Sequence, residues 1–326
     1  MKDPNPILAV RNLEISFPGN GGMLPLVSEL SLDLQRGRTL GLVGESGCGK
    51  TLTSLSILGL TPAPGQVTGG EILYAGTNLV NKSERELDKY RGDRIAMIFQ
   101  EPMTALNPVF TVGSQIAEVL IVHRGFSNAV AWDKVVQMLD RVGIPDAAKR
   151  AHAYPHQLSG GMRQRAMIAM AMVTEPDVLI ADEPTTALDV TIQAQILDLM
   201  LEMQAALGTA ILFITHDLGV VSELADDIAV MYAGKVVETG PARQVLSTPQ
   251  HPYTRALIET LPASAKPGSR LPTIEGMVPD LATLPTGCRF ADRCNRVLDD
   301  CRMAQPELES AGDNQLAACF HLGAGQ

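Results

Sequence analysis

The stretch Gly44–Thr51 restricts the possible folds of this chain more than any other. It reads Gly-Glu-Ser-Gly-Cys-Gly-Lys-Thr and matches the phosphate-loop pattern G-x-x-x-x-G-K-[ST] at every fixed position. The apolar run Arg38–Val43 predicts a buried strand before it, and Leu52–Leu60 has the apolar spacing of a helix after it. This motif requires a strand, a loop and a helix in that order, so a chance match in a glycine-rich turn is the weaker explanation.

Such a loop can bind the phosphates of a nucleotide. Its glycines let backbone N–H groups surround a phosphate, and the following helix adds the positive end of its dipole. Lys50 supplies a mobile positive charge, and Thr51 can ligate Mg²⁺. Phe17 ends a predicted strand that begins at Leu8 and is either a platform for an adenine ring or an ordinary core residue. The residues predicted to bind nucleotide in the loop are Gly44, Glu45, Ser46, Gly47, Cys48, Gly49, Lys50 and Thr51.

Composition narrows the classes of function. The 326 residues can form one large domain with an appendage, or two domains. A formal net charge of −10 argues against an extensive nucleic-acid interface, so no nucleic-acid partner is expected. No stretch approaches about 18 uncharged apolar residues, and the N-terminus lacks the apolar core of a signal peptide. The chain is therefore expected in the cytosol unless a partner holds it at a membrane.

Three further apolar runs each end in polar residues. Gln100 follows Arg94–Phe99, Asp182 and Glu183 follow a run that begins at Val178, and His216 follows Thr209–Thr215. Parallel strands gather their carboxyl ends on one edge of a sheet, so these side chains are expected to converge on the phosphate loop. Gln100 and Asp182 could then ligate Mg²⁺, and Glu183 could polarise an attacking water. Alone, Gln100 and His216 would more readily be explained as structural residues.

The pattern between Val112 and about Thr174 is helical, with interruptions at glycine and proline. It contains a Gly-Gly turn that opens a helix, where Ser159, Gly160 and Gly161 form a second potential anion-binding site. Beyond about His251, repeated prolines predict an extended segment with little regular structure.

That C-terminal segment contains four cysteines without the paired C-x2-C spacing of a common zinc ribbon. Disulfides are disfavoured in a reducing cytosol, so clustered thiols there suggest ligation of a soft metal. A [4Fe–4S] cluster, a Zn²⁺ ion and no metal at all remain open on the residues alone. The four candidates are Cys288, Cys294, Cys301 and Cys319.

The order of these motifs resembles the ATP-binding subunit of ABC transporters over the whole chain. One departure is Met162, where most of that superfamily has Gln, and Phe17 is Tyr in many members. The matching elements are similar to Walker A at Gly44–Thr51, the Q-loop at Gln100, the signature at Leu158–Met162, Walker B at Val178–Glu183, the D-loop at Ala187–Asp189 and the switch histidine at His216.

Three sequence motifs narrow the resemblance to the dipeptide and oligopeptide importer ATPases: Met97–Pro108, His251–Thr254 and Gly287–Cys294. Nickel and glutathione importers are close relatives of this branch and are the main alternative. The fold implied is α/β: residues 1–250 would form a P-loop ABC ATPase domain with a RecA-like core, an antiparallel β subdomain and a helical subdomain at about 103–175. Residues 251–326 would form a C-terminal extension with the four cysteines.

The function implied is ATP hydrolysis that powers uptake of dipeptides or oligopeptides through a bacterial importer. Two ATPase subunits, this chain and a homologous one, would bind two ATP molecules between them, at the cytoplasmic face of the inner membrane. Two transmembrane permease subunits would connect them to a periplasmic peptide-binding protein. Some peptide-importer ATPases have a similar cysteine segment that holds a [4Fe–4S] cluster.

The same resemblance assigns roles to residues. Lys50 and the loop N–H groups would hold the β- and γ-phosphates, and Thr51, Gln100 and Asp182 would hold Mg²⁺. Glu183 would activate water and His216 would sense the γ-phosphate. The ATP of the partner subunit would be contacted by Ser159, Gly160, Gly161 and Asp189.

Two other classes of protein explain less. An ABC ATPase of DNA repair or translation usually has long coiled coils or two nucleotide domains, whereas this chain has one domain and no heptads. A P-loop kinase for a small molecule would leave the Leu158–Met162 motif unexplained.

Overall fold

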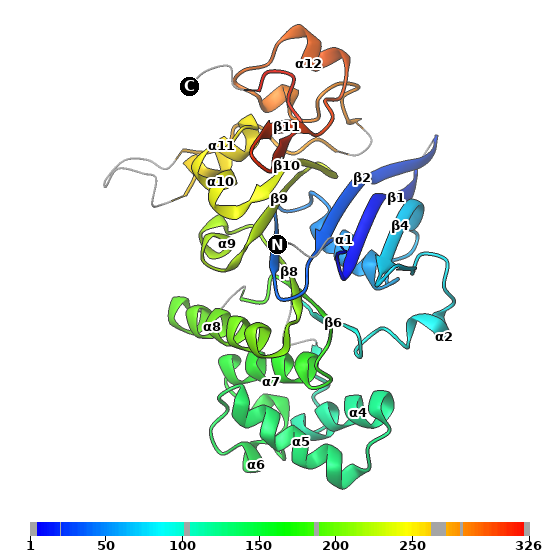
Figure 1. Cartoon of the computed structure of the whole chain (residues 1–326), viewed down its shortest axis with the longest axis vertical. Helices are drawn as coiled ribbons and strands as arrows, with labels where there is room; N and C mark the ends of the chain where they lie inside the picture. Colours follow the sequence, from blue (N-terminus) through cyan, green and yellow to red (C-terminus); the bar gives the residue numbers. More distant parts are fainter. Residues whose placement is uncertain are drawn as a thin grey trace. The chain divides into compact units, whose positions relative to one another are not determined.

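The computed structural model describes residues 5–19, 21–100, 105–185, 189–261, 272–280 and 283–322 (Figure 1). By its contacts the chain divides into two units, each described by itself. The helical unit comprises residues up to Ile7, Gln35–Arg38 and Asn81–Leu212. The phosphate-loop unit comprises Leu8–Leu34, Thr39–Val80 and the chain from Phe213 onward, so it holds both the phosphate loop and the C-terminal cysteines.

The helical unit contains two buried strands, β6 and β7, which pair in parallel. The first half of β8 (Ala210–Thr215) lies beside β7, so the strand order is β8-β7-β6. The helix α4 begins after Thr111, whose side chain accepts a hydrogen bond from the Ser114 N–H, and ends at Gly125 with φ +65°. The elements are α2 (Glu84–Leu87), β6 (Ile95–Ile98), α4 (Val112–Arg124), α5 (Asn128–Arg141), α6 (Ala147–Arg150), a 3₁₀ turn (Pro155–Gln157), α7 (Gly160–Met172), β7 (Val178–Asp182) and α8 (Val190–Leu207).

The phosphate-loop unit contains two sheets. One is antiparallel, in the order β2-β1-β4-β5, and the other has the order β11-β12-β10-β9-β3 followed by the second half of β8. β3 is parallel to β9, while β10 pairs antiparallel with β9 and β12. The elements are β1 (Leu8–Gly19), β2 (Gly22–Leu34), β3 (Thr39–Val43), α1 (Lys50–Ile57), β4 (Gln66–Tyr74), β5 (Thr77–Asn78), α9 (Leu218–Leu224), β9 (Asp227–Tyr232), β10 (Lys235–Pro241), α10 (Ala242–Ser247), α11 (Pro252–Glu259), a 3₁₀ turn (Ala291–Arg293), α12 (Asp299–Met303), β11 (Glu309–Gly312) and β12 (Gln315–Ala317).

Continuous apolar runs became fully buried strands, as expected for a parallel sheet covered on both faces. Every residue of β3, β7 and β8 is buried. The predicted α/β fold with an antiparallel β part and a helical part is confirmed.

The prediction of little regular structure beyond His251 holds for residues 272–280, which contain no helix or strand, but it is wrong at the two ends of this segment. Pro252 does not break the chain but begins α11, because the first helical position needs no N–H donor. The His251 ring Nδ1 caps that helix by accepting a hydrogen bond of 3.0 Å from the Tyr253 N–H. Further along, β12 extends the sheet by pairing with β10.

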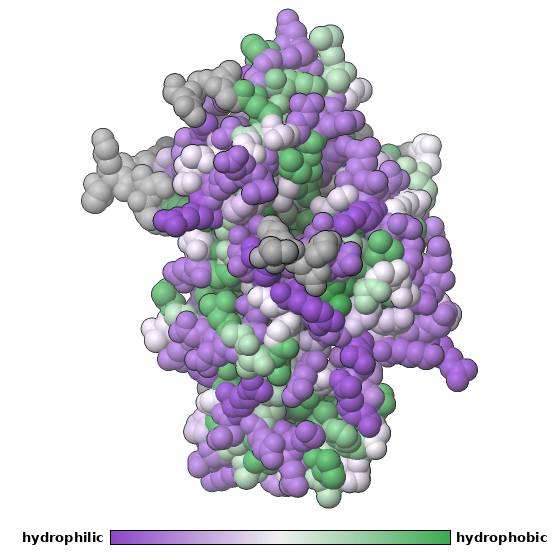
Figure 2. Space-filling model, in the orientation of Figure 1, coloured by the Kyte–Doolittle hydropathy of each residue, from purple (hydrophilic) through white to green (hydrophobic). Residues whose placement is uncertain are grey.

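Hydrophilic residues cover most of the face in Figure 2, and apolar residues are gathered in separate patches. Within the described residues, no helix has the length and apolar character needed to cross a membrane.

Candidate functional site

The phosphate loop connects β3 to α1, as predicted. A Cβ atom on Gly44 would overlap the Met231 carbonyl oxygen, so this position tolerates only glycine. Gly49 precedes α1 with φ +106°, a conformation that side-chain-bearing residues rarely adopt. The loop can therefore keep this path only because these positions are glycines.

Lys50 lies inside the loop rather than in solvent. Its side chain is buried, and Nζ donates hydrogen bonds to the carbonyl oxygens of Gly44 (2.7 Å) and Glu45 (3.0 Å). Cys48 is also buried, and burial raises the pKa of its thiol. The Cys48 carbonyl accepts a hydrogen bond of 2.9 Å from the Gly234 N–H in the turn between β9 and β10, which fixes this half of the loop.

The opposite side of the loop is open. Ser46, Gly47 and Thr51 are exposed, and α1 has neither a side-chain cap nor an acidic residue in its first turn. Uncapped N–H groups and the positive end of the helix dipole favour an anion here. Thr51 is therefore accessible to a cation at the start of α1.

Phe17 is half-buried at the end of β1. Its ring fills the space beside Gly65, where a Cβ atom would meet the ring. Stacking of an adenine on Phe17 stays a prediction.

In the helical unit, Gln100, Asp182 and Glu183 lie close together. β6 and β7 are parallel neighbours with Ile98 opposite Ala181, so both strands end at the same edge. Gln100 Nε2 donates a hydrogen bond of 3.1 Å to Glu183 Oε2, and Asp182 is buried beside Glu183. Glu183 itself has φ +46°, a strained conformation for a residue other than glycine that occurs preferentially at functional sites.

Ser159 and Asp189 both cap helices in the helical unit. The Ser159 hydroxyl accepts a hydrogen bond of 3.3 Å from the Met162 N–H at the start of α7, where Gly160 and Gly161 form the first turn. This cap uses only the backbone of Met162, so the side-chain departure from the family pattern leaves it intact. The Asp189 carboxylate accepts a hydrogen bond of 3.0 Å from the Ile192 N–H.

His216 follows β8 and is exposed in the phosphate-loop unit. The structure thus brings together Gln100, Asp182 and Glu183 in one unit, and places Phe17, the phosphate loop and His216 in the other. The meeting of the two sets around one nucleotide stays a prediction. Residues 101–104 of the importer-like phrase and Ala187 and Leu188 of the D-loop lie outside the described residues.

The four C-terminal cysteines line one cavity of about 20 Å³ in the phosphate-loop unit. The Cys288 N–H donates a hydrogen bond of 2.8 Å to the Cys301 carbonyl oxygen, which joins two of the cysteine segments. Burial raises the pKa of the Cys288 thiol to about 11 and also raises the pKa values of Cys294 and Cys319. These thiols are therefore protonated at neutral pH unless a cation binds them.

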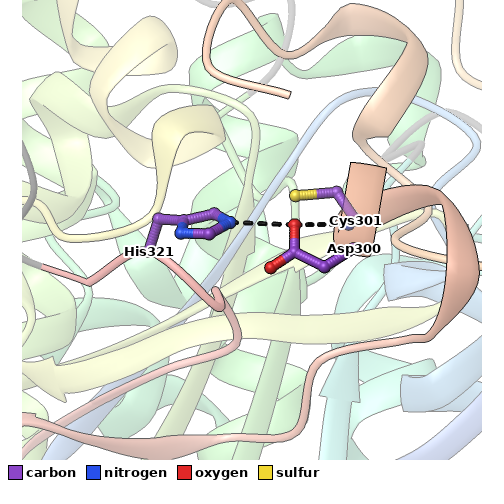
Figure 3. Close-up of side chains that lie close together, drawn as sticks. All are labelled: Asp300, Cys301 and His321. Atoms are coloured by element: carbon purple, nitrogen blue, oxygen red, sulfur yellow. Dashed lines mark hydrogen bonds and ion pairs between the residues drawn. The ribbon is translucent and has the colours of Figure 1, made fainter. Parts of the chain in front are cut away.

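Beside this cavity, Asp300 connects the segment that contains Cys301 to the segment that contains His321 (Figure 3). Asp300 Oδ1 lies 3.0 Å from His321 Nε2 and accepts a hydrogen bond of 2.8 Å from the Cys301 N–H. The ligand atoms of Asp300, Cys301 and His321 lie within 4.8 Å of one another, and within the described ranges they form the only group of three or more potential metal ligands that is so compact. No three of the four cysteine sulfurs therefore lie within 4.8 Å of one another. A single Zn²⁺ ion with Zn–S bonds of about 2.3 Å would require them to be closer than this.

Sequence reasoning missed two residues that contact the phosphate loop. The Tyr253 hydroxyl accepts a hydrogen bond of 2.9 Å from the Glu45 N–H, and Arg293 forms an ion pair with the Glu45 carboxylate. Both residues belong to phrases typical of the importer branch, but they lie 208 and 248 positions from Glu45. No local pattern indicates such contacts.

Comparison with known families matches two parts of the chain. Residues 27–186 match the family described as ABC transporter, and residues 237–301 match the oligopeptide/dipeptide transporter, C-terminal region.

Similar proteins cover nearly the whole chain. A dipeptide transport ATP-binding protein of Bacillus subtilis is 49% identical over 96% of this chain and 94% of its own length. An oligopeptide transport ATP-binding protein of Salmonella typhimurium is 47% identical over 97% of this chain and 94% of its own. Among solved structures, a bacterial ABC transporter cassette determined as a dimer has a TM-score of 0.64 and 26% identity, covering 72% of this chain and 99% of that chain.

Proposed function

The chain belongs to the ATP-binding proteins of ABC transporters, as the ATP-hydrolysing subunit of a peptide importer, and from this premise we propose how its residues divide the work. The observation that carries the proposal is the group at the ends of β6 and β7. There, Glu183 has a strained backbone and a hydrogen bond from Gln100, next to the buried Asp182. A water-activating carboxylate, an amide and a metal-binding carboxylate at one sheet edge suit phosphoryl transfer to water.

Nucleotide binding falls to the phosphate loop. Lys50 and the loop N–H groups hold the β- and γ-phosphates of ATP, and Phe17 stacks on the adenine. Thr51, Gln100 and Asp182 offer the oxygen ligands that Mg²⁺ prefers. The exposed position of Thr51 at the start of α1 and the uncapped first turn support this assignment.

Hydrolysis falls to Glu183. Its carboxylate accepts a proton from water while the water oxygen bonds to the γ-phosphorus, and the bond from that phosphorus to the ADP oxygen breaks. His216 contacts the γ-phosphate and reports its presence. Gln100 orients Glu183 through the hydrogen bond already present.

Closure of two ATPase subunits around ATP drives transport. Ser159, Gly160, Gly161 and Asp189 complete the ATP site of the partner subunit, which is a homologous ATPase rather than a second copy. The pair works at the cytoplasmic face of the inner membrane with two permease subunits, which receive peptides from a periplasmic binding protein. The domain boundary proposed is residue 250, with the helical subdomain at about 103–175.

The pairing is tested with the Glu183→Gln variant, which holds ATP without hydrolysing it. Size-exclusion chromatography with ATP and Mg²⁺ should show a complex when the homologous ATPase of the same importer is added. Lys50→Met should prevent this complex, because it removes the charge that binds the phosphates. A stable, fully active importer that contains only this ATPase would contradict the proposed heteromeric pair.

For the four C-terminal cysteines we propose a [4Fe–4S] cluster. The four cysteines line one cavity, as the thiolate ligands of a [4Fe–4S] cluster would, although this cavity of about 20 Å³ would have to widen to admit a cluster. Backbone groups already support the cysteines, since the Arg296 N–H donates to Cys294 Sγ at 3.4 Å. When bound, such a cluster supplies a structural crosslink between segments that are distant in sequence.

The cluster is tested on protein purified without oxygen. We expect a broad absorption band at about 400 nm and about four irons per chain. Cys301→Ser should remove both, whereas Cys48→Ser should retain them because Cys48 lies in the phosphate loop. Colourless protein with one zinc per chain, or with no metal, would contradict the cluster and leave the ATPase assignment intact.

A further inference from the structure

Glu45 of the phosphate loop is held at two points by the C-terminal part of the phosphate-loop unit. Its N–H donates to the Tyr253 hydroxyl at 2.9 Å. Its carboxylate receives two hydrogen bonds from Arg293, from Nη1 to Oε2 at 2.6 Å and from Nη2 to Oε1 at 3.0 Å. Both partners come from the region after residue 250.

Arg293 is fixed in place rather than mobile on the surface. Its side chain is only 5% exposed, and its guanidinium carbon lies 5.7 Å from the centre of the Tyr232 ring. Nε and Nη2 also donate to the backbone carbonyls of Glu275 and Ile274. A planar guanidinium held this way fixes the carboxylate it binds in both position and orientation.

Tyr253 is equally fixed. It is fully buried, and its ring lies 4.6 Å from the ring of Tyr232 and 5.4 Å from that of Phe290 between centres. Tyr253 and Phe290 share a hydrophobic core with Val43, the last residue of the strand that leads into the loop. The C-terminal region and the base of the phosphate loop are therefore parts of one packed core.

We propose that Arg293 and Tyr253 are positioning residues for ATP binding: they hold Glu45 so that the phosphate loop is shaped for phosphate before the nucleotide arrives. This inference rests on the proposed role of the loop. The loop has no regular structure between Val43 and Lys50, so an external hold lowers the conformational entropy that the loop loses on binding.

Charge supplies a second reason. Glu45 is a carboxylate in a loop that binds a polyanion, and an unpaired carboxylate there would repel the phosphates. Arg293 neutralises it through two short hydrogen bonds. Loss of Arg293 therefore removes the hold on the loop and at the same time leaves the negative charge of Glu45 unpaired beside the phosphates.

The test measures the dissociation constant of ATP in the presence of Mg²⁺ by equilibrium dialysis on the full chain. Arg293→Met should weaken ATP binding about ten- to a hundredfold, the range for losing a charge-assisted hydrogen bond in a partly buried site. Arg293→Lys should restore part of the affinity. The matched control is Arg302→Met in the same region, which breaks an exposed ion pair with Asp292 and should leave ATP affinity unchanged.

A double variant separates positioning from a purely structural role. Adding Glu45→Gln to Arg293→Met removes the unpaired carboxylate, so the double variant should bind ATP more tightly than Arg293→Met alone. A purely structural role for Arg293 predicts a lower urea midpoint with no such recovery of affinity. If Arg293→Met does not fold, Tyr253→Phe tests the same hold, because it removes only the hydroxyl that accepts the Glu45 N–H.

Unchanged ATP affinity in folded Arg293→Met and Tyr253→Phe chains, with the wild-type chain binding ATP, would overturn this inference alone. Strictly additive effects of Arg293→Met and Glu45→Gln would overturn it as well. A wild-type chain that does not bind ATP would overturn the proposed function and this inference together.

Discussion

Gly234, in the turn between β9 and β10, should be among the positions least tolerant of a side chain. It has φ +85°, and a Cβ atom there would overlap the backbone carbonyl oxygen of Leu26. Its N–H donates to the Cys48 carbonyl and its carbonyl accepts from the Ser28 N–H, each at about 3 Å, so the turn connects the phosphate loop to β2. Gly234→Ala should therefore destabilise the fold and loosen the loop.

The size of the effect follows from two terms. The left-handed conformation costs a residue with a Cβ atom about 1–2 kcal/mol. Forcing backbone apart to admit a methyl group costs about 1–3 kcal/mol more, and Leu26 cannot relieve the overlap by a side-chain rotation. The free energy of unfolding should fall by about 2–5 kcal/mol in total.

Gly76→Ala is the matched control. Gly76 lies in the same unit, in the turn between β4 and β5, with φ +80° and no atom within 4 Å of a Cβ position. It carries the conformational cost without the overlap, so its loss should be about 1–2 kcal/mol. Urea unfolding followed by circular dichroism gives both values, and equal losses for the two variants would refute the reasoning. Only Gly234→Ala should also weaken ATP binding.

Three further predictions concern chemistry and pH. Glu183→Gln should retain ATP binding but lower the rate of hydrolysis by about 10²–10⁴-fold, as expected for loss of a general base. Phosphate release by the importer complex measures this rate, and undiminished turnover would show that Glu183 is not the base. Lys50→Met should abolish measurable ATP binding in equilibrium dialysis, and unchanged affinity would contradict the assignment of the loop. Burial lowers the pKa of His251 to about 3, below its usual value near 6.5. Because the unfolded chain then binds the proton more readily, the free energy of unfolding should fall as the pH drops from about 6.5 towards 3, by up to about 1.4 kcal/mol per pH unit. Burial raises the pKa of the neighbouring Glu238, which has the opposite effect on the pH dependence of stability. His251→Asn keeps a helix-capping side chain and should remove only the histidine contribution, as measured by urea unfolding at several pH values. An unchanged pH dependence in this variant would show that His251 is not responsible.

Much of the fold could be predicted because it depends on local patterns. The apolar residues of β3, β7 and β8 are continuous rather than alternating, which is the pattern of strands buried on both faces. The phosphate-loop motif itself specifies a strand before it and a helix after it. Gln100 and Glu183 could be expected to meet, because parallel strands present their carboxyl ends at one edge.

The missed features depend on partners distant in sequence. Arg293 and Tyr253 contact Glu45 across more than 200 residues, and only the packed core around Tyr232 brings them there. A pattern confined to a short window contains no information on such pairs.

The position of β12 in the sheet has a consequence for synthesis of the protein. Since β12 pairs with β10, and Arg293 and Tyr253 hold Glu45, the early-made phosphate loop gains its last supports from segments translated near the end of the message. Nascent chains fold as segments emerge from the ribosome, so a chain stopped near residue 250 would contain all the nucleotide motifs without the contacts that hold the loop. Premature termination should therefore yield poorly competent ATPases, which limits how far a truncated subunit could compete for a place in the importer.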